Sequence, residues 1–373
     1  MESNKILLKN EPLRISSSDL NPILQHCTDI NTSDITIQTG MPIIAEVYGK
    51  LETITSRSLT NSEVGVLLNT IYGPNGTTQI LSGIDLDTNY EFRPTRNTRY
   101  RYRVNATGCT ISGHQGIQIT LRTIPTDPPN IKDMGLEPDL VDKLSPEQGV
   151  VYVTGATGSG KSTLLASIIR NIAEDPECNR KIITYESPIE FVYDNLDTRT
   201  AVISQSEVPL HLPSFAYGVR NALRRKPKLI LVGEARDAET ISAVLDAALT
   251  GHPVYTTLHT NGVAETIRRL VGSFSKEERN GKTIDIIETT KVILWQKLVP
   301  TLDGKRTALR EYLLLDDKIR EELLSVNIEM ITAKTRECLK KYGVTMLDSA
   351  QKAFNNNLIS KKQLDYIETY SKD

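Results

Sequence analysis

The residues best suited to chemistry lie at positions 155–162, where the sequence reads GATGSGKS. This stretch fits the pattern G-x-x-x-x-G-K-[ST] of a phosphate-binding loop. Its glycines let backbone N–H groups converge on a phosphate, and the start of a following helix adds a favourable potential. We predict that Lys161 reaches the β- and γ-phosphates of ATP and that the Ser162 hydroxyl is a ligand of Mg²⁺. The residues predicted to bind the nucleotide are Gly155, Ala156, Thr157, Gly158, Ser159, Gly160, Lys161, Ser162 and Thr163.

The segments on either side have the periodicity that such a loop needs. Residues 149–154 (GVVYVT) are apolar and β-branched, which predicts a short strand. Behind the loop, apolar residues recur at helical spacing at Leu164, Leu165, Ile168, Ile169 and Ile172. The alternative, an ordinary glycine-rich turn between a strand and a helix, would leave Lys161 without a role.

Polar side chains also follow three further apolar segments. Glu186 comes directly after the strand-like run IITY at 182–185, and Glu190 follows a few residues later. Glu234 ends the apolar segment 229–233, as in a Walker B strand that holds an acid near Mg²⁺ and water. His259 follows another strand and could hydrogen-bond a γ-phosphate. A solvated acidic loop and a structural histidine are the alternatives, but the convergence of these groups favours a catalytic site.

Strands and helices alternate from residue 149 onward, so these strand ends should meet at one edge of a sheet. The alternation predicts an α/β fold with a mostly parallel sheet covered on both faces. The expected strands are 149–154, 181–185, 201–204, 229–233 and 254–258. The expected helices are 161–173, 214–225, 238–250 and 263–273. After about residue 275 the pattern is mostly helical, apart from one strand at 308–315.

The sequence before this region predicts a smaller domain. Apolar residues alternate over 35–47, which indicates a hairpin, and residues 61–72 have helical spacing with Ser62 as a possible cap. The segment IPTDPP at 124–129 interrupts any regular structure. We therefore expect three parts along the chain, an N-terminal α/β domain at 1–122, a linker at 123–135 and a nucleotide-binding domain with a helical C-terminal region at 136–373.

Arginines alternate with apolar residues in the N-terminal domain. Arg99, Arg101 and Arg103 would lie on one face of a strand, with tyrosine and valine on the other. Arg122 ends the next predicted strand. One interpretation is a half-buried strand with a solvated face; the other is a row of arginines that faces phosphate. No acidic run nearby in sequence offers these arginines obvious partners.

Composition narrows the class of protein. The formal net charge of −2 and a pI near 6.3 give no general attraction to nucleic acid or to an acidic membrane. The 4 cysteines are scattered singly, which suggests neither a zinc ribbon nor a disulfide framework and favours the cytosol. No apolar run approaches membrane-spanning length, so we expect no stable insertion into a membrane.

Four motifs read together resemble one family. They are GATGSGKS, TYESPIEF at 184–191, LILVGEARDAET at 229–240 and TLHTN at 257–261. The combination resembles the PilT-like branch of the secretion ATPase superfamily, and the resemblance covers nearly the whole chain. Within that branch, SDITIQTG at 33–40 and RYRYRVNAT at 99–107 are similar to segments of type IVB (Dot/Icm) secretion ATPases and their IncI-type conjugation relatives.

The resemblance implies roles for individual residues. Glu190 matches the general base, with Glu186 beside it, Glu234 matches the Walker B glutamate, and His259 matches the His-box histidine. The region from which the family supplies arginines to a neighbour's nucleotide contains Arg101, Arg103 and Arg122.

This sequence departs from the family's pattern at two positions. Ser187 stands where the family has the aspartate of its Asp box, and Lys228 stands where many relatives have another aspartate. Compared with the family's pattern, both departures imply that metal coordination would rest more on Ser162, the phosphates and water.

The resemblance also implies a fold and an activity. We expect a PAS-like α/β domain followed by a RecA-like P-loop ATPase domain, assembled as a homohexamer with ATP and Mg²⁺ between protomers. The expected protein is a cytoplasmic ATP hydrolase that powers a type IVB secretion or conjugative apparatus. It would be recruited peripherally by inner-membrane proteins of that machine. The alternatives are a type IV pilus retraction motor and a DNA-translocating ring, although the charge gives no reason to expect nucleic-acid binding.

Overall fold

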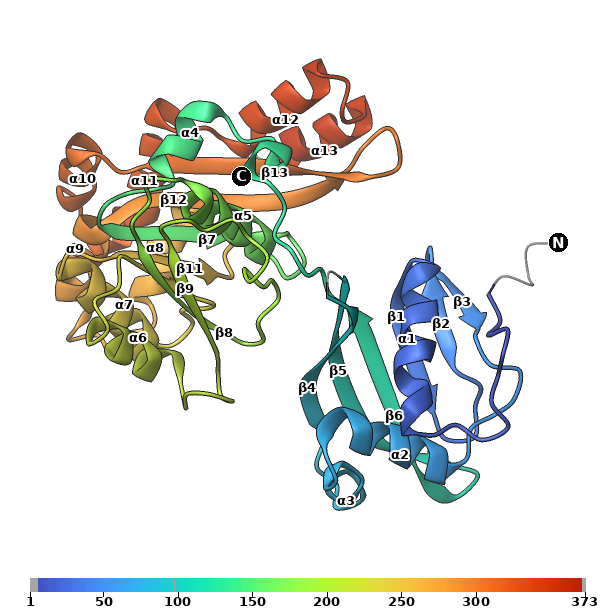
Figure 1. The fold of residues 1–373 in the computed structure, drawn as a ribbon. Helices are drawn as coiled ribbons and strands as arrows, with labels where there is room; N and C mark the ends of the chain where they lie inside the picture. The colour runs from blue at the N-terminus through green and yellow to red at the C-terminus, as the bar shows by residue number, and fades with distance from the viewer. Residues whose placement is uncertain (1–5, 97, 371–373) are drawn as a thin grey trace. The chain divides into compact units, whose positions relative to one another are not determined.

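Two separate sheets organise the chain in the computed structural model, which describes residues 6–96 and 98–370 (Figure 1). The chain divides into two compact units, Met1–Thr126 and Asp127–Asp373. Each unit has its own sheet and its own hydrophobic core.

The first unit is built on a 6-stranded antiparallel sheet with the order β3-β2-β1-β6-β5-β4. Its strands are β1 (Thr32–Gln38), β2 (Ile44–Val47), β3 (Lys50–Thr53), β4 (Leu86–Thr95), β5 (Thr98–Ile111) and β6 (His114–Thr123). Its helices are the short η2 (Ser17–Asp19), α1 (Leu20–Asp29), α2 (Asn61–Tyr72) and α3 (Gly76–Leu81). Alternate strand residues such as Ile35 and Leu121 share one core with α1 and α2. The predicted hairpin is confirmed as β1 and β2.

The start of α2 corrects one prediction. Thr60 caps the helix, not Ser62, because the Thr60 side chain accepts from the backbone N–H of Glu63. The Glu63 carboxylate in turn accepts from the backbone N–H of Thr60 at 2.9 Å and of Ile15 at 2.8 Å. A side-chain hydrogen bond from Arg57 lowers the pKa of Glu63 to about 2. This buried carboxylate therefore joins the N-terminal segment to the helix that covers the sheet.

The second unit contains a 7-stranded sheet with the order β13-β12-β7-β11-β10-β8-β9. All neighbours run parallel except β12 and β13. The strands are β7 (Gly149–Thr154), β8 (Lys181–Glu186), β9 (Val202–Glu207), β10 (Leu229–Val232), β11 (Pro253–Leu258), β12 (Thr290–Pro300) and β13 (Arg306–Leu314). The predicted mostly parallel sheet is confirmed, and β7 lies near its centre.

Helices cover both faces of this sheet (Figure 1). One face packs against α6 (Phe215–Leu223), α7 (Ala238–Leu249), α8 (Val263–Val271), α9 (Arg279–Thr289), α10 (Asp317–Leu324) and α11 (Ile331–Tyr342), with the short η4 (Ile328–Met330) before α11. The other face packs against η3 (Ile131–Met134), α4 (Pro138–Lys143) and α5 (Lys161–Glu174). A further cluster joins β12 and β13 to α12 (Met346–Asn355) and α13 (Lys361–Tyr370).

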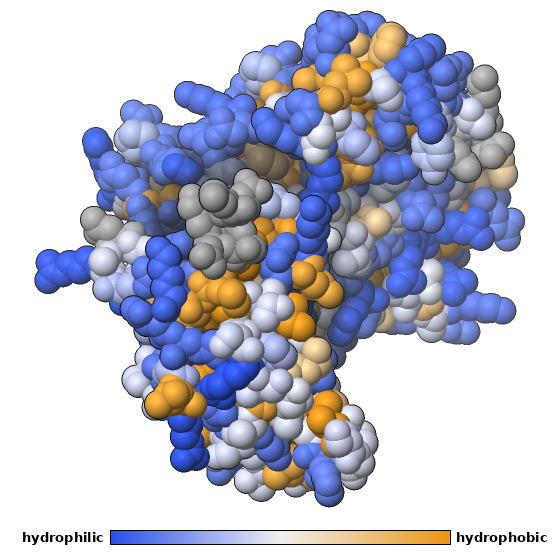
Figure 2. Space-filling view, turned by 90° about the vertical axis from the view of Figure 1, so that its right-hand side faces the viewer, coloured by the Kyte–Doolittle hydropathy of each residue, from blue (hydrophilic) through white to orange (hydrophobic). Residues whose placement is uncertain are grey.

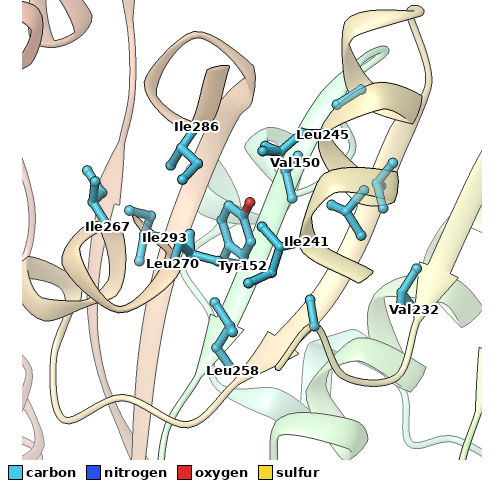
Figure 3. Packing of buried hydrophobic residues seen from close by; sticks show 14 of the residues in the cluster. Val150, Tyr152, Val232, Ile241, Leu245, Leu258, Ile267, Leu270, Ile286 and Ile293 are labelled. Atoms are coloured by element: carbon cyan, nitrogen blue, oxygen red, sulfur yellow. The ribbon is translucent and has the colours of Figure 1, made fainter. Parts of the chain in front are cut away.

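The interior strand β7 shows why the sheet needs helices on both faces. Val150 and Tyr152 lie in the hydrophobic cluster on the face that packs against α7 and α8. Val151 and Val153 lie in the cluster on the face that packs against α5. Figure 3 shows the Tyr152 ring among aliphatic side chains from α7, α8, β11 and β12. Because successive strand residues point to opposite faces, a strand that is apolar at every position must be buried on both.

One strand of this sheet was not predicted. The segment after residue 275 was expected to hold one strand, but it holds two, β12 and β13, which pair from Val292 with Leu314 to Pro300 with Arg306. β12 begins directly after α9, without a turn between them. No glycine or proline therefore marks the start of this strand in the sequence. On its other side, β12 pairs with β7.

The surface differs in character from these cores. On the face shown in Figure 2, apolar side chains lie in small groups separated by hydrophilic ones. Within residues 6–96 and 98–370, no helix combines the length and the apolar character that crossing a membrane requires.

Candidate nucleotide-binding site

The predicted phosphate loop connects the interior strand β7 to a helix. β7 ends at Thr154 and α5 begins at Lys161, so the loop leaves the carboxyl end of a buried parallel strand. Gly158 and Gly160 adopt φ values of +74° and +83°, a region that favours glycine. Ser159 between them is not left-handed, so left-handed and other backbone conformations alternate along the loop. Such alternation points successive N–H groups into one hollow, as anion binding requires.

Lys161 lies across this loop. Its side chain is almost buried, and its Nζ donates to the carbonyl oxygens of Gly155 and Ala156, both at 2.9 Å. Burial lowers the pKa of Lys161, while the charges of Glu234 and Glu190 oppose that shift. The ammonium group is thus already inside the loop and within the field of two carboxylates.

The structure brings the predicted catalytic side chains into one pocket of about 280 Å³. Lys161 and Ser162 line it from the loop, and each neighbouring strand end adds one or more polar groups. The other predicted residues that line it are Thr157, Gly158, Glu186, Glu190, Glu234 and His259. Strand ends that lie far apart in sequence therefore meet as expected for a parallel sheet.

Glu186 is held by residues that the sequence did not single out. Its Oε1 accepts from the Thr184 hydroxyl at 2.6 Å and from Gln205 Nε2 at 3.1 Å. Thr184 could have been found, because it lies two positions earlier on β8 and so on the same face of the strand. Gln205 gave no local signal, since it lies on β9, beside β8 only in the folded sheet.

Glu234 faces two basic side chains. His259 Nε2 lies 3.6 Å from one Glu234 oxygen, and Arg236 Nη1 lies 3.9 Å from the other. These groups come from loops after β10 and β11, which are neighbours in the sheet. A carboxylate and an imidazole in this arrangement can orient water and sense charge on a bound phosphate.

The loop after His259 is fixed from outside the pocket. Glu311 on β13 accepts from the backbone N–H of Val263 at 2.8 Å and from that of Met346 at 3.3 Å. These are the first residues of α8 and α12, so one carboxylate caps two helices. Glu311 was not predicted, because its partners are distant in sequence.

The arginines of the first unit do not form a uniformly solvated row. Arg99 and Arg101 are 7% and 6% exposed and lie 3.0 and 3.4 Å from Glu91 on β4. Arg103 pairs with Asp87 at 2.9 Å, and Arg122 with Asp34 at 2.8 Å. The sequence suggested no acidic partners, but pairing of β4 and β1 with their neighbours supplies them.

Fold and site together define a P-loop ATPase with a RecA-like domain. The chain belongs to the Type II/IV secretion system protein family, whose family model matches residues 17–357. The predicted membership in the secretion ATPase superfamily, the α/β fold and the ATP hydrolase activity are confirmed.

Three similar proteins extend this result. The X-ray structure of the Legionella pneumophila ATPase DotB is 59% identical, with 97% of this chain and 98% of that chain covered at a TM-score of 0.86. The crystal structure of the pilus retraction motor PilT with bound ADP is 28% identical over 95% of this chain and 96% of that one, with a TM-score of 0.80. The type IV pilus retraction ATPase PilT of Pseudomonas aeruginosa is 32% identical over 302 residues, 81% of this chain and 84% of that protein. The expected resemblance to type IVB secretion ATPases is thereby confirmed.

Proposed function

We propose that this chain is a cytoplasmic, homohexameric motor that hydrolyses ATP to power a type IVB (Dot/Icm-like) secretion apparatus or a related conjugative one. The observation that carries the proposal is the 59% identity to DotB over nearly the full length of both chains. This similarity extends through both units. It therefore supports a shared oligomeric assembly and a shared secretion machine (the client of the motor), in addition to shared ATPase chemistry.

The pocket suggests a role for each side chain. The loop N–H groups and Lys161 bind the phosphates, and Glu190 orients the attacking water. Glu234 and His259 complete the polar wall around the γ-phosphate. The Ser162 hydroxyl and nearby carboxylates are oxygen donors of the kind that Mg²⁺ prefers, and the ion would neutralise charge on the phosphates when bound.

Exchange of the proposed catalytic acids separates binding from hydrolysis. We expect Glu190→Gln and Glu234→Gln to bind ATP and to lower turnover by about 100-fold or more, because the amide keeps the shape but loses the charge. Binding is measured with a fluorescent nucleotide and turnover by phosphate release. Glu239→Gln is the matched control, since this exposed glutamate on α7 pairs with Arg220 outside the pocket. If only one pocket variant is inactive, the residue whose exchange leaves activity intact is not the base.

In the proposed hexameric ring, the first unit would contribute to the active site of a neighbouring protomer. A PAS-like domain at 1–122 would supply arginines to the nucleotide of the neighbouring protomer, and the linker at 123–135 would act as the hinge between domains. Candidates for the arginine that acts in trans are Arg101, Arg103 and Arg122. Hydrolysis would then change the angle between domains and do work on the client machine.

Recruitment through protein partners tests the proposed client. We expect the protein in cell fractions to join the inner membrane only when the proteins of the secretion apparatus are present. The purified protein should not bind plain liposomes, since the net charge of −2 gives no attraction to acidic lipid. Stable liposome binding, or membrane association that is independent of the apparatus, would contradict the proposal.

A pilus retraction motor is the second candidate, favoured by the similarity to PilT. It shares the chemistry and differs in client, so recruitment by pilus-assembly proteins in place of secretion proteins would select it. DNA-stimulated turnover with a steep salt dependence would instead support a DNA-translocating ring.

A further inference from the structure

Gln296 contacts the phosphate-binding loop from the neighbouring strand. It lies on β12, is 1% exposed, and its Nε2 donates to the carbonyl oxygen of Ser159 at 2.7 Å. The C=O and N–H of a planar trans peptide point in opposite directions. The hydrogen bond therefore turns the N–H of Gly160 away from β12, as a loop that cradles phosphate with its N–H groups requires.

Arg310 determines which end of the Gln296 amide faces the loop. It lies opposite Gln296 in the register of β12 and β13, and its Nε donates to Gln296 Oε1 at 2.8 Å. A guanidinium has only donors, so the amide oxygen must face Arg310 and the amide nitrogen must face Ser159. Burial lowers the pKa of Arg310 to about 10, which leaves the group charged at neutral pH.

Two loop glycines make this close approach possible. A Cβ atom at Gly160 would lie 2.9 Å from Gln296 Nε2, and one at Gly155 would clash with the Gln296 carbonyl oxygen. The main chain of the loop thus packs directly on Gln296, with no side chain between them. A displacement of Gln296 must therefore reach the loop backbone.

We propose that Gln296, oriented by Arg310, is a positioning residue that holds the Ser159–Gly160 peptide ready for phosphate. The inference rests on the proposed assignment of the nucleotide to this loop. A loop that is ordered in advance binds with a smaller entropy cost. The backbone N–H of Arg310 also donates to the Ser349 hydroxyl on α12 at 3.0 Å, so the same contacts connect the loop to the C-terminal helices.

ADP affinity and the unfolding temperature without nucleotide separate positioning from simple packing. Gln296→Glu can still accept from Arg310 but offers no donor to Ser159, and Gln296→Met removes both bonds at similar volume. We expect either change to raise the Kd for ADP by about 10–100-fold, by analogy with the loss seen for outer-shell groups that orient metal ligands. Arg310→Met should act in the same direction, and Arg310→Lys, which keeps a donor for Gln296, should restore most of the affinity.

Arg320→Met is the matched control. Arg320 is also a buried arginine, but it donates to the carbonyl oxygens of Thr290 and Leu315, away from the loop. We expect this change to lower the unfolding temperature and to leave the Kd for ADP unaltered.

The outcomes also distinguish this inference from the site assignment. If Lys161→Ala loses ADP while Gln296→Glu binds it within twofold of wild type, the positioning role is wrong and the site stands. If neither change affects ADP binding, the site assignment falls and this inference falls with it. Should the Gln296 variants fail to fold, equal Kd values for Arg310→Met and Arg310→Lys would contradict the inference.

Discussion

Lys161→Ala is expected to abolish ATP turnover and to weaken nucleotide binding by roughly 10²–10³-fold. Truncation of one partner of a buried, hydrogen-bonded charge pair at a binding surface typically costs about 2–5 kcal/mol of binding free energy, because the other charge is left without compensation. Here the lysine lies under the loop carbonyls and within the field of Glu190 and Glu234. Without its charge, two carboxylates would face the phosphates of ATP across a pocket of about 280 Å³.

Fluorescent-nucleotide titration and phosphate release measure the two effects. Lys228→Ala is the control, since it removes the same charge from an exposed position of the same unit. Activity close to that of wild type in Lys161→Ala would refute the assignment of the site.

The second large effect concerns an arginine that acts in trans. An arginine delivered by a neighbouring protomer can contribute about 10³–10⁵ in rate, because it stabilises charge on the transferred phosphoryl group. Arg101 is 6% exposed, whereas Arg103 and Arg122 are 48% and 69% exposed. Arg103 and Arg122 are also directly opposite in the register of β5 and β6, so both side chains lie on one face of the sheet. These two are therefore the first candidates to exchange, with Arg101 tested beside them.

A mixing experiment tests the assignment. Lys161→Ala protomers have an inactive site but intact arginines, and Arg103→Ala protomers have an intact site but no donor. We expect neither ring alone to turn over ATP and mixed rings to recover activity. Native mass measurement must first confirm that the rings mix. The control partner carries Lys161→Ala and Arg103→Ala together and should restore nothing. If rings mix and activity stays absent for Arg101, Arg103 and Arg122 in turn, the trans assignment is wrong.

Local patterns in the sequence accounted for the pocket at one edge of the sheet in the second unit. The loop follows the apolar run of β7, and the acids follow the apolar runs of β8 and β10. A parallel sheet brings the ends of such strands together at one edge. The cap of α2 was also readable, because Thr60 and Glu63 have the spacing of a capping box. The prediction of Ser62 as a possible cap is wrong, because the glutamate three positions after Thr60 selects that residue.

Contacts between distant segments could not be read in this way. Gln296 bonds to a residue 137 positions away, and no local pattern indicates that contact. The acids that pair with the arginines likewise become neighbours only through strand register, as Glu91 does with Arg101. A single sequence carries periodicity and turn chemistry, whereas register depends on how complete strands fit together.

The double cap formed by Glu311 bears on how the protein can be divided. The same carboxylate holds the first turn of α8, which follows the His259 loop, and the first turn of α12. Excision of α12 would leave a half-buried acid with one donor fewer, beside the loop that carries the histidine. The C-terminal helices therefore belong to the enzymatic module itself, and a chimaera that exchanges them between relatives must exchange β13 with them.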